Sequence, residues 1–187
     1  MKVIIFSAPS GAGKTTIVRH LVTKPEFNLE FSVSACTRPP RMHEVHGKDY
    51  YFMSLEEFKQ HLQNKEFLEY EEVYKDIFYG TLKSEVQKIH DENRNVIFDV
   101  DVKGGLNIKK HYGENALAIF VKPPSLDILQ KRLLQRSTES EEKLKMRLGK
   151  AVYEMKYEQF FDKVIVNDNL DHALEEAENI ISEFLAL

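Results

Sequence analysis

The residues best suited to phosphate chemistry lie near the start of the chain, in the run Ser10-Gly11-Ala12-Gly13-Lys14-Thr15-Thr16. A glycine-rich turn lets several backbone N–H groups point into one concavity, which can hold an anion. The N-terminus of a following helix adds partial positive charge at the same place. In such a loop Lys14 reaches the β- and γ-phosphates of a nucleotide, and the Thr15 hydroxyl coordinates Mg²⁺. The sequence therefore predicts a phosphate-binding P-loop over residues 8–16.

One position departs from the P-loop pattern G-x-x-x-x-G-K-S/T, because Ala8 stands where the first glycine belongs. A Cβ is tolerable there if the backbone angles are ordinary. The alternative interpretation is a tight strand-to-helix turn with an exposed lysine. The context favours the P-loop, since an apolar run at 3–6 precedes it and a helical pattern at 17–22 follows it.

Two groups of arginines offer cations to a phosphate ligand. Arg38 and Arg41 flank two prolines, so a stiff loop can hold their forked guanidinium groups against a terminal phosphate. Arg132, Arg136 and Arg147 surround a polar interruption between two helical patterns, and such a segment could close over a triphosphate. The alternatives are solvated surface arginines in the first group and an ordinary amphipathic helix in the second.

Acidic side chains form a third group. Asp99 and Asp101 end an apolar run, where a Walker B acid normally sits, and their spacing predicts that they share one face of a strand. Glu69 lies among apolar neighbours and needs a partner there, unless it is an edge-strand charge facing water. The seven histidines are scattered and show no H-E-x-x-H spacing, so we expect no dedicated histidine metal site.

The composition is that of a globular protein. The chain has 187 residues, 42% of them hydrophobic, which predicts one domain with a sizeable core. A net charge of −4 argues against a dedicated nucleic-acid or anionic-membrane surface. With Cys36 as the single cysteine and no apolar leader or spanning run, we expect a cytoplasmic protein without disulfides. Nothing in the sequence indicates an oligomeric state.

The pattern of elements predicts an α/β fold. Buried strands alternating with helices imply a parallel sheet covered on both faces, with ligands at the carboxyl ends of the strands. Ser54 with Glu57, and Thr138 with Glu141, have the spacing of capping boxes. We expect strands at residues 3–7, 29–36, 49–53, 67–73, 77–81, 95–101, 116–121 and 164–167. We expect helices at residues 15–23, 55–64, 83–91, 104–111, from 126, from 139 and at 168–187.

Taken together, the motifs resemble the guanylate kinase family over nearly the whole chain and in family order. The resemblance implies a P-loop NTPase-type core at 1–33, 83–125 and 149–187, a β-rich nucleotide-monophosphate-binding insertion at 34–82 and a helical lid at 126–148. The runs that carry it are S-x-P-S-G-A-G-K-T-T, F-S-V-S-x-x-T-R-x-P-R, G-K-D-Y-Y-F, F-L-E, F-Y-G-T, D-V-D-V-K-G, R-S-T-E-S-E-E and V-I-V-N-D.

The resemblance also implies an activity, the Mg²⁺-assisted transfer of a phosphoryl group from ATP to GMP, and a role for each matching residue. Catalysis would fall to Lys14, Arg41, Arg136 and Arg147. Asn167 would touch the adenine of ATP, and Asp99 would lie near the metal and phosphates. The ATP half would comprise Ser10, Gly11, Ala12, Gly13, Lys14, Thr15, Thr16, Arg132 and Asn167. The GMP half would comprise Ser34, Arg38, Arg41, Tyr50, Glu69, Tyr79, Thr81, Asp99 and Asp101.

The GMP half divides by chemistry. Arg38 and Arg41 would grip the phosphate, with Tyr50 and Tyr79 as hydrogen-bond partners. Guanine presents N1–H and N2–H₂ donors beside an O6 acceptor, so carboxylates and hydroxyls together can read it. AMP inverts part of that pattern and would leave buried groups unpaired. The guanine-reading set would be Ser34, Glu69, Thr81 and Asp101.

Three positions depart from the family pattern: Ala8, Thr81 in place of a common serine, and Ser137 in place of a frequent glycine. The segment between Glu69 and Tyr79 is also one residue longer than the family norm. Two alternatives to a GMP kinase stay open. One is a non-catalytic guanylate-kinase-like module that binds proteins, which the intact P-loop and lid arginines disfavour. The other is a kinase of the same fold for another acceptor, such as a ribosyl bisphosphate.

Overall fold

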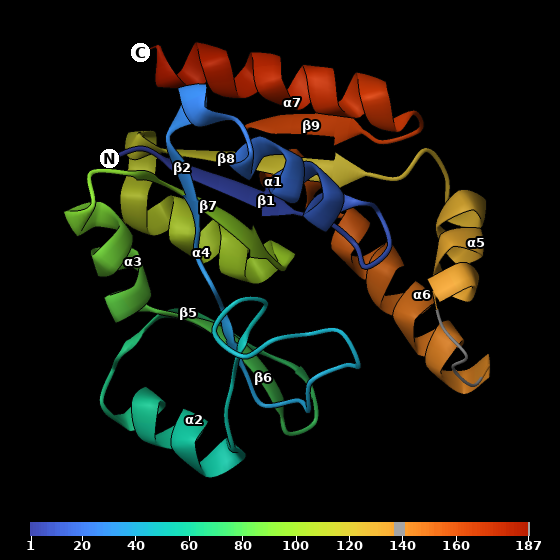
Figure 1. Ribbon diagram of the computed structural model, residues 1–187. Coiled ribbons are helices and arrows are strands. Elements are labelled where there is room, and N and C mark those ends of the chain that lie inside the picture. The colour runs from blue at the N-terminus through green and yellow to red at the C-terminus, as the bar shows by residue number, and fades with distance from the viewer. Residues whose placement is uncertain (137–140, 187) are drawn as a thin grey trace.

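The computed structural model describes residues 1–136 and 141–186 (Figure 1). Its strands are β1 Val3–Ser7, β2 Leu29–Phe31, β3 Ala35–Cys36, β4 Tyr51–Phe52, β5 Phe67–Tyr74, β6 Ile77–Leu82, β7 Asn95–Val100, β8 Ala116–Lys122 and β9 Lys163–Val166. Its α-helices are α1 Lys14–Val22, α2 Leu55–Gln63, α3 Lys83–Asp91, α4 Val102–Tyr112, α5 Leu126–Arg136, α6 Glu141–Met155 and α7 Leu170–Leu185. Three short 3₁₀ turns lie at Pro25–Phe27, Gly113–Asn115 and Glu158–Phe160.

The core of the fold is a parallel sheet of five strands in the order β2-β7-β1-β8-β9. All five run in the same direction, so their carboxyl ends lie along one edge. The expected α/β architecture is thereby confirmed. The P-loop follows β1, the central strand; Asp99 lies near the end of its neighbour β7, and Asp101 directly follows that strand.

Helices cover both faces of this sheet, because its strands are apolar on both sides. Successive residues of β1 alternate between the faces: Ile4 and Phe6 pack under α1 and α7, whereas Val3 and Ile5 pack under α3 and α4. Figure 1 shows α7 and α1 on one side of the sheet and α3 and α4 on the other. The buried sheet therefore supplies a rigid base for the loops at its edge.

The insertion forms a second, smaller sheet in the order β4-β3-β6-β5, with α2 packed against it. Its core joins Phe58 of α2 to Phe67 of β5, whose rings stack with centroids 4.3 Å apart. The single strand expected at 29–36 is wrong: β2 pairs with β7 in the main sheet, and β3 pairs with β6 in the small one. The expected strand at 49–53 shortens to β4.

Cys36 lies fully buried in β3, and burial raises the pKa of its thiol to about 11. This side chain is therefore a packing group and not a nucleophile. Asp101 does not lie in the strand expected at 95–101, because β7 ends at Val100. It is instead the N-cap of α4, where its side chain accepts a hydrogen bond from the Gly104 N–H at 2.8 Å. The expected common strand face for Asp99 and Asp101 is therefore wrong.

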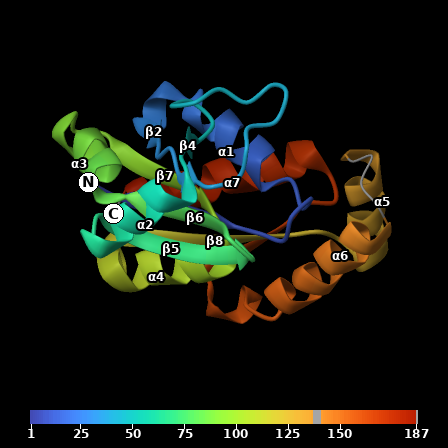
Figure 2. The ribbon, with the colours of Figure 1, turned by 90° about the horizontal axis from the view of Figure 1, so that it is seen from below.

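Helices α5 and α6 form an arm beside the sheet edge, which Figure 2 shows from below. They pack on each other through Leu129 and Leu133 of α5 and Ala151 of α6. Helix α6 continues to Met155, past the boundary at 148 expected for the lid. The Ser125 hydroxyl caps the start of α5, accepting from the Ile128 N–H at 3.2 Å. Ser137 and Thr138, with the second expected capping box, lie outside the described residues. Among the helices that are described, none combines the length and the apolar character needed to cross a bilayer.

The capping box of α2 provides a test of how local sequence stabilises the insertion. The Ser54 hydroxyl accepts from the Glu57 N–H at 3.1 Å, and the Glu57 carboxylate accepts from the Ser54 N–H at 2.7 Å. We expect Ser54→Ala to lower the free energy of unfolding by about 1 kcal/mol, measured by urea denaturation. Ser182→Ala, an exposed change within α7, is the matched control and should leave stability within about 0.5 kcal/mol. Equal effects would show that the cap contributes nothing.

Candidate active site

A cavity of about 1000 Å³ opens at the carboxyl edge of the main sheet, between the P-loop, the insertion and α6. Most residues predicted from the sequence to bind ligands line it, although they come from segments far apart in the chain. Lining residues among the predicted set are Ser10, Gly11, Gly13, Lys14, Thr15, Ser34, Arg38, Arg41, Tyr50, Glu69, Tyr79, Asp99, Asp101 and Arg147.

The P-loop has the backbone geometry that its glycines permit. Gly11 and Gly13 have φ angles of 93° and 98°, in the left-handed region that side chains rarely adopt. Ala8 does not share this conformation, since it is absent from the positive-φ residues, and its methyl group is buried in the core. The missing first glycine therefore leaves the turn intact.

Lys14 and Thr15 meet Asp99 across the boundary between β1 and β7. The Lys14 ammonium forms an ion pair with the Asp99 carboxylate and donates to the Val100 carbonyl at 2.7 Å. The Thr15 hydroxyl donates to the other Asp99 oxygen at 2.6 Å. Lys14 is therefore held at the cavity wall and is not the exposed lysine of the alternative interpretation. A phosphate entering the loop would meet a positioned cation and hydroxyl.

The insertion carries a second group of cations, of which Arg38 is the centre. Its guanidinium donates two hydrogen bonds to Glu44, at 2.6 and 2.7 Å, and a third to the Tyr79 hydroxyl at 2.9 Å. It also lies 4.8 Å from the ring centre of Tyr50. In turn, Arg38 holds the pKa of the Glu44 carboxyl below its usual value. Arg41, by contrast, is 70% exposed and is the more available of the two guanidinium groups.

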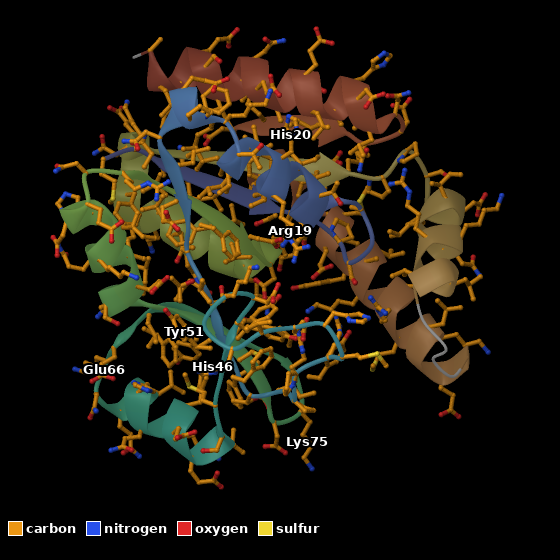
Figure 3. All side chains as sticks on the ribbon, in the orientation of Figure 1. Arg19, His20, His46, Tyr51, Glu66 and Lys75 are labelled. Carbon is orange, nitrogen blue, oxygen red and sulfur yellow. The ribbon has the colours of Figure 1, made fainter. Side chains whose placement is uncertain are left out.

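The loop with these arginines is tied to the rest of the molecule at two places. Arg19 of α1 donates to Asp49 at 3.0 Å, which joins the loop to the core. His46 packs edge-on against Tyr51, with ring centres 5.8 Å apart, and Figure 3 labels both residues beside the small sheet. These contacts restrict the loop that presents Arg38 and Arg41 to the cavity.

Glu69 is a buried carboxyl at the inner end of the cavity. Thr81, itself fully buried, donates its hydroxyl to Glu69 at 2.7 Å. Burial raises the pKa of Glu69 to about 7, a rise that the Thr81 hydrogen bond opposes and the nearby Asp101 charge adds to. The close approach of α4 requires Gly104, because a Cβ there would press on the Glu69 carboxylate. The carboxyl is thus aimed into the cavity by β5, β6 and α4 together.

Arg147 is the arginine of α6 that the family resemblance assigns to catalysis. It reaches from α6 to the P-loop, where it donates to the Ser10 hydroxyl at 2.6 Å. The side chain of Arg136, at the end of α5, lies outside what the structure describes. The arm thus brings at least one cation to the phosphate loop.

Among the predicted residues whose side chains the structure describes, five do not line the cavity: Ala12, Thr16, Thr81, Arg132 and Asn167. Thr81 acts on it through Glu69. Asn167 is 5% exposed, and its side-chain amide donates to the Ala12 carbonyl at 2.8 Å. The contact expected between Asn167 and adenine stays a prediction.

Two acids important to the geometry were missed by the sequence reasoning. Glu44 pairs with Arg38, and its position three residues after Arg41 was the available signal. Glu154 of α6 is 4% exposed, lines the cavity and forms an ion pair with Lys150 at 3.6 Å. Burial raises its pKa, which Lys150 opposes. An acid placed three residues after the buried Ala151 on one helix was the signal in that case.

A P-loop and the arginines of a separate insertion line one cavity, a combination typical of P-loop kinases that act on small phosphorylated acceptors. The sequence model of the family described as guanylate kinase matches residues 1–184. The chain belongs to the guanylate kinase family.

Individual relatives agree over most of their length. Guanylate kinase from Bacteroides fragilis is 54% identical over 186 residues, which cover 100% of this chain and 91% of that protein. Guanylate kinase from Porphyromonas gingivalis is 52% identical over 185 residues, covering 99% and 98% respectively. The crystal structure of guanylate kinase from Anaplasma phagocytophilum is 27% identical, with a TM-score of 0.77, and covers 97% of this chain and 85% of that one.

The raised pKa of Glu69 predicts a pH-dependent cost to stability. Since the folded pKa of about 7 exceeds the ordinary value of 4.5, ionisation favours the unfolded chain, and stability is lost as pH rises between these values. Glu69→Gln removes this loss, because the amide does not ionise. We compare the free energy of unfolding of the variant with that of the wild type at two pH values. The variant's advantage should be larger at pH 8 than at pH 4, by roughly 3 kcal/mol. Urea denaturation at both pH values measures the difference, and a pH-independent difference would contradict the shift.

Proposed function

We propose that the chain transfers the γ-phosphoryl group of ATP to GMP, giving ADP and GDP. The observation that carries this proposal is the single cavity shared by the P-loop lysine and by the Arg38 and Glu69 groups. The first group suits a nucleoside triphosphate, and the second suits a purine monophosphate. Membership of the guanylate kinase family supports the same pairing of substrates.

The ATP half would be built on the P-loop. Backbone N–H groups of residues 10–16 would surround the phosphates, and Lys14 would leave its ion pair with Asp99 to contact the β- and γ-phosphates. Arg132 and Asn167 belong to this half as well, although neither lines the cavity. The helix that begins at Lys14 adds the positive end of its dipole.

The phosphate of GMP would bind at the stiff loop of the insertion. Glu44 already orients Arg38. The guanidinium would therefore lose little further side-chain freedom when a phosphate binds. Arg41 would close on the same phosphate and on the transferred group. The hydroxyl groups of Tyr50 and Tyr79 would donate to the phosphate oxygens, because burial raises the pKa of both phenols and keeps them protonated.

Guanine would be recognised at the inner end. Ionised Glu69 would accept from guanine N1–H and N2–H₂, with Asp101 as a second acceptor. The hydroxyls of Ser34 and Thr81 would donate toward O6 or hold the carboxylate in place, as Thr81 does here. AMP lacks this donor pattern and would leave the buried Glu69 carboxylate unpaired, so the site should reject it strongly.

Phosphoryl transfer needs positioning and charge neutralisation more than a general base. An oxygen of the GMP phosphate attacks the γ-phosphorus, and the bond from that phosphorus to the bridging oxygen of ADP breaks. Lys14, Arg41, Arg136 and Arg147 would neutralise the charge that spreads over the transferred group. The Arg147 contact with Ser10 supports this role, since it places a lid cation at the phosphate loop.

Mg²⁺ fits the same site by its donor chemistry. Thr15 and Asp99 offer hydroxyl and carboxylate oxygens next to the P-loop, and oxygen is the ligand type that Mg²⁺ prefers. No cluster of three or more His, Cys, Asp or Glu able to hold a metal occurs in the described residues, which suits an ion held mainly by ATP phosphates. When bound, the ion would offset phosphate charge, with Thr15 as its protein ligand and Asp99 nearby.

The division into a core at 1–33, 83–125 and 149–187, an insertion at 34–82 and a lid at 126–148 belongs to this proposal. The separate small sheet and the α5–α6 arm support it. The cytoplasm is the proposed location, in keeping with a buried, unpaired Cys36 and substrates that are intracellular nucleotides.

A coupled assay of ADP formation tests the proposal directly. Purified protein with ATP and Mg²⁺ should turn over GMP, with a kcat/KM at least about 10⁴-fold above that for AMP. Equal rates with both acceptors would remove the guanine assignment. Turnover of a ribosyl bisphosphate but not GMP would favour the other acceptor, and no turnover at all would favour the protein-binding alternative.

The P-loop lysine gives the sharpest test of the ATP half. Lys14→Ala should lower kcat by at least about 100-fold, because a cation that stabilises the transferred phosphoryl group is lost. Lys24→Ala is the matched control: Lys24 follows the C-terminal end of α1, pairs with Glu178 at 2.8 Å and does not line the cavity, so its removal should leave kcat unchanged. Near-normal kcat in Lys14→Ala would exclude the P-loop from the chemistry.

Glu69 predicts how GMP binding depends on pH. Guanine donors need the ionised carboxylate, and with a pKa near 7 this form predominates at pH 8 but not at pH 6. We expect the KM for GMP to rise about tenfold from pH 8 to pH 6 in the wild type. The phosphate of GMP titrates over the same range, so Glu69→Gln supplies the reference. The variant should show a higher KM at pH 8 and a clearly smaller rise toward pH 6, and an unchanged rise would rule out Glu69 as the titrating group.

A further inference from the structure

Asn167 occupies an unusual place for a residue expected to touch a base. It follows β9, and its backbone N–H donates to the Lys122 carbonyl at 2.8 Å, so the chain is still bound to the sheet there. Its side chain is directed to the back of the P-loop, where Nδ2 donates to the Ala12 carbonyl at 2.8 Å. That carbonyl acceptor fixes which end of the amide faces the loop.

The packing around this hydrogen bond leaves no room for variation. A Cβ at position 13 would collide with the Asn167 amide nitrogen, so Gly13 is required there by space as well as by its φ of 98°. Ala12 is fully buried, and Asn167 is 5% exposed. The amide is therefore part of the solid support on which the loop lies, and it does not face the cavity.

The same residue connects the P-loop to the lid arm. Arg132 of α5 donates to the backbone carbonyl of Asn167 at 2.9 Å. The first turn of the loop packs on the same helix, since a Cβ at Gly11 would lie 3.0 Å from the Leu133 side chain and 3.2 Å from that of Leu129. Two independent contacts thus place α5 against the loop, one through Asn167 and one through Gly11.

We propose that Asn167 is a positioning residue for the P-loop, which acts on the triphosphate of ATP through the Ala12 carbonyl and not on the adenine base. This inference rests on the proposed function, because it assumes that the loop binds ATP phosphates. The hydrogen bond fixes the peptide between Ala12 and Gly13, and thereby the N–H groups that follow it at the start of α1. Arg132 fixes the Asn167 backbone in turn and so serves ATP indirectly.

Physical chemistry gives the direction of the effect. Without Nδ2, the buried Ala12 carbonyl loses its side-chain donor, and a buried polar group without a partner is costly. The loop can then lower its free energy by adopting other turns, in which the carbonyl accepts a hydrogen bond from water. Phosphate binding must select the productive turn from these, so affinity for any triphosphate falls by the productive fraction.

Inorganic tripolyphosphate separates the two possible roles, because it has the phosphates of ATP and no base. Calorimetric titrations with Mg²⁺ should compare both ligands on the wild type and on Asn167→Ala. We expect the dissociation constants of ATP and tripolyphosphate to rise by the same factor, about tenfold. A rise for ATP alone would overturn the proposal in favour of an adenine contact, and no rise for either would overturn it outright.

Two further variants complete the design. Asn167→Leu keeps nearly the same size and removes the donor without adding a charge, so it should weaken both ligands to a similar extent and carries the test if Asn167→Ala does not fold. Asn169→Ala is the matched control, since Asn169 only caps α7 by accepting from the His172 N–H at 3.2 Å. It should leave both affinities unchanged, and a loss as large as that of Asn167→Ala would overturn the proposal.

Hydrogen exchange of the ligand-free proteins gives a readout without nucleotide. Amides of residues 10–17 should exchange faster in Asn167→Leu than in the wild type, whereas those of α7 should not change. Unchanged exchange at the loop would contradict a positioning role. A wild type that binds neither ATP nor tripolyphosphate would instead overturn the proposed function.

Discussion

The contact between Lys14 and Asp99 is the interaction on which the site depends, because it joins the P-loop to the neighbouring strand. β1 and β7 pair in parallel, with Phe6 beside Asp99 and Ser7 beside Val100. That register brings the lysine, the Thr15 hydroxyl and the aspartate to one point at the carboxyl edge of the sheet. The three groups satisfy one another before any ligand arrives, so the charges cost little to hold close together. In the proposed complex, a phosphate would take the place of the Asp99 carboxylate beside Lys14, and Mg²⁺ would become the partner of the Thr15 hydroxyl.

The insertion brings two kinds of group to the cavity, the cations Arg38 and Arg41 and the buried acid Glu69. Arg38 is held by Glu44 and Tyr79, which lowers the entropy that binding must remove. Glu69 is held by Thr81 in a place where ionisation is unfavourable. In the proposed acceptor site the two ends therefore differ physically: the phosphate end is preorganised and charged, and the base end would become favourable only when guanine donors meet the carboxylate. This difference would give a physical basis for selecting guanine.

The arm of α5 and α6 connects these halves. It contributes Arg147 to the phosphate loop and Glu154 to the cavity wall, and α5 packs on Gly11. Because these side chains are packed together, a displacement of the arm would also displace the P-loop. Asn167 and Arg132 extend the same support to the back of the loop.

Much of this protein is determined locally by its sequence. The glycines of the P-loop, the capping box at Ser54 and the apolar runs of the main sheet each specify their structure through short-range sterics and hydrogen bonding, and so were predictable. Most of the residues that the family motifs assigned to ligands do line the cavity. Tertiary structure decided the rest. Residues 29–36 alternate as one strand would, and only the distant partners β7 and β6 divide them between two sheets. The pairing of Arg38 with Glu44, the raised pKa of Glu69 and the turn of Asn167 toward Ala12 depend on burial and on neighbours from other segments, which spacing along the chain does not encode.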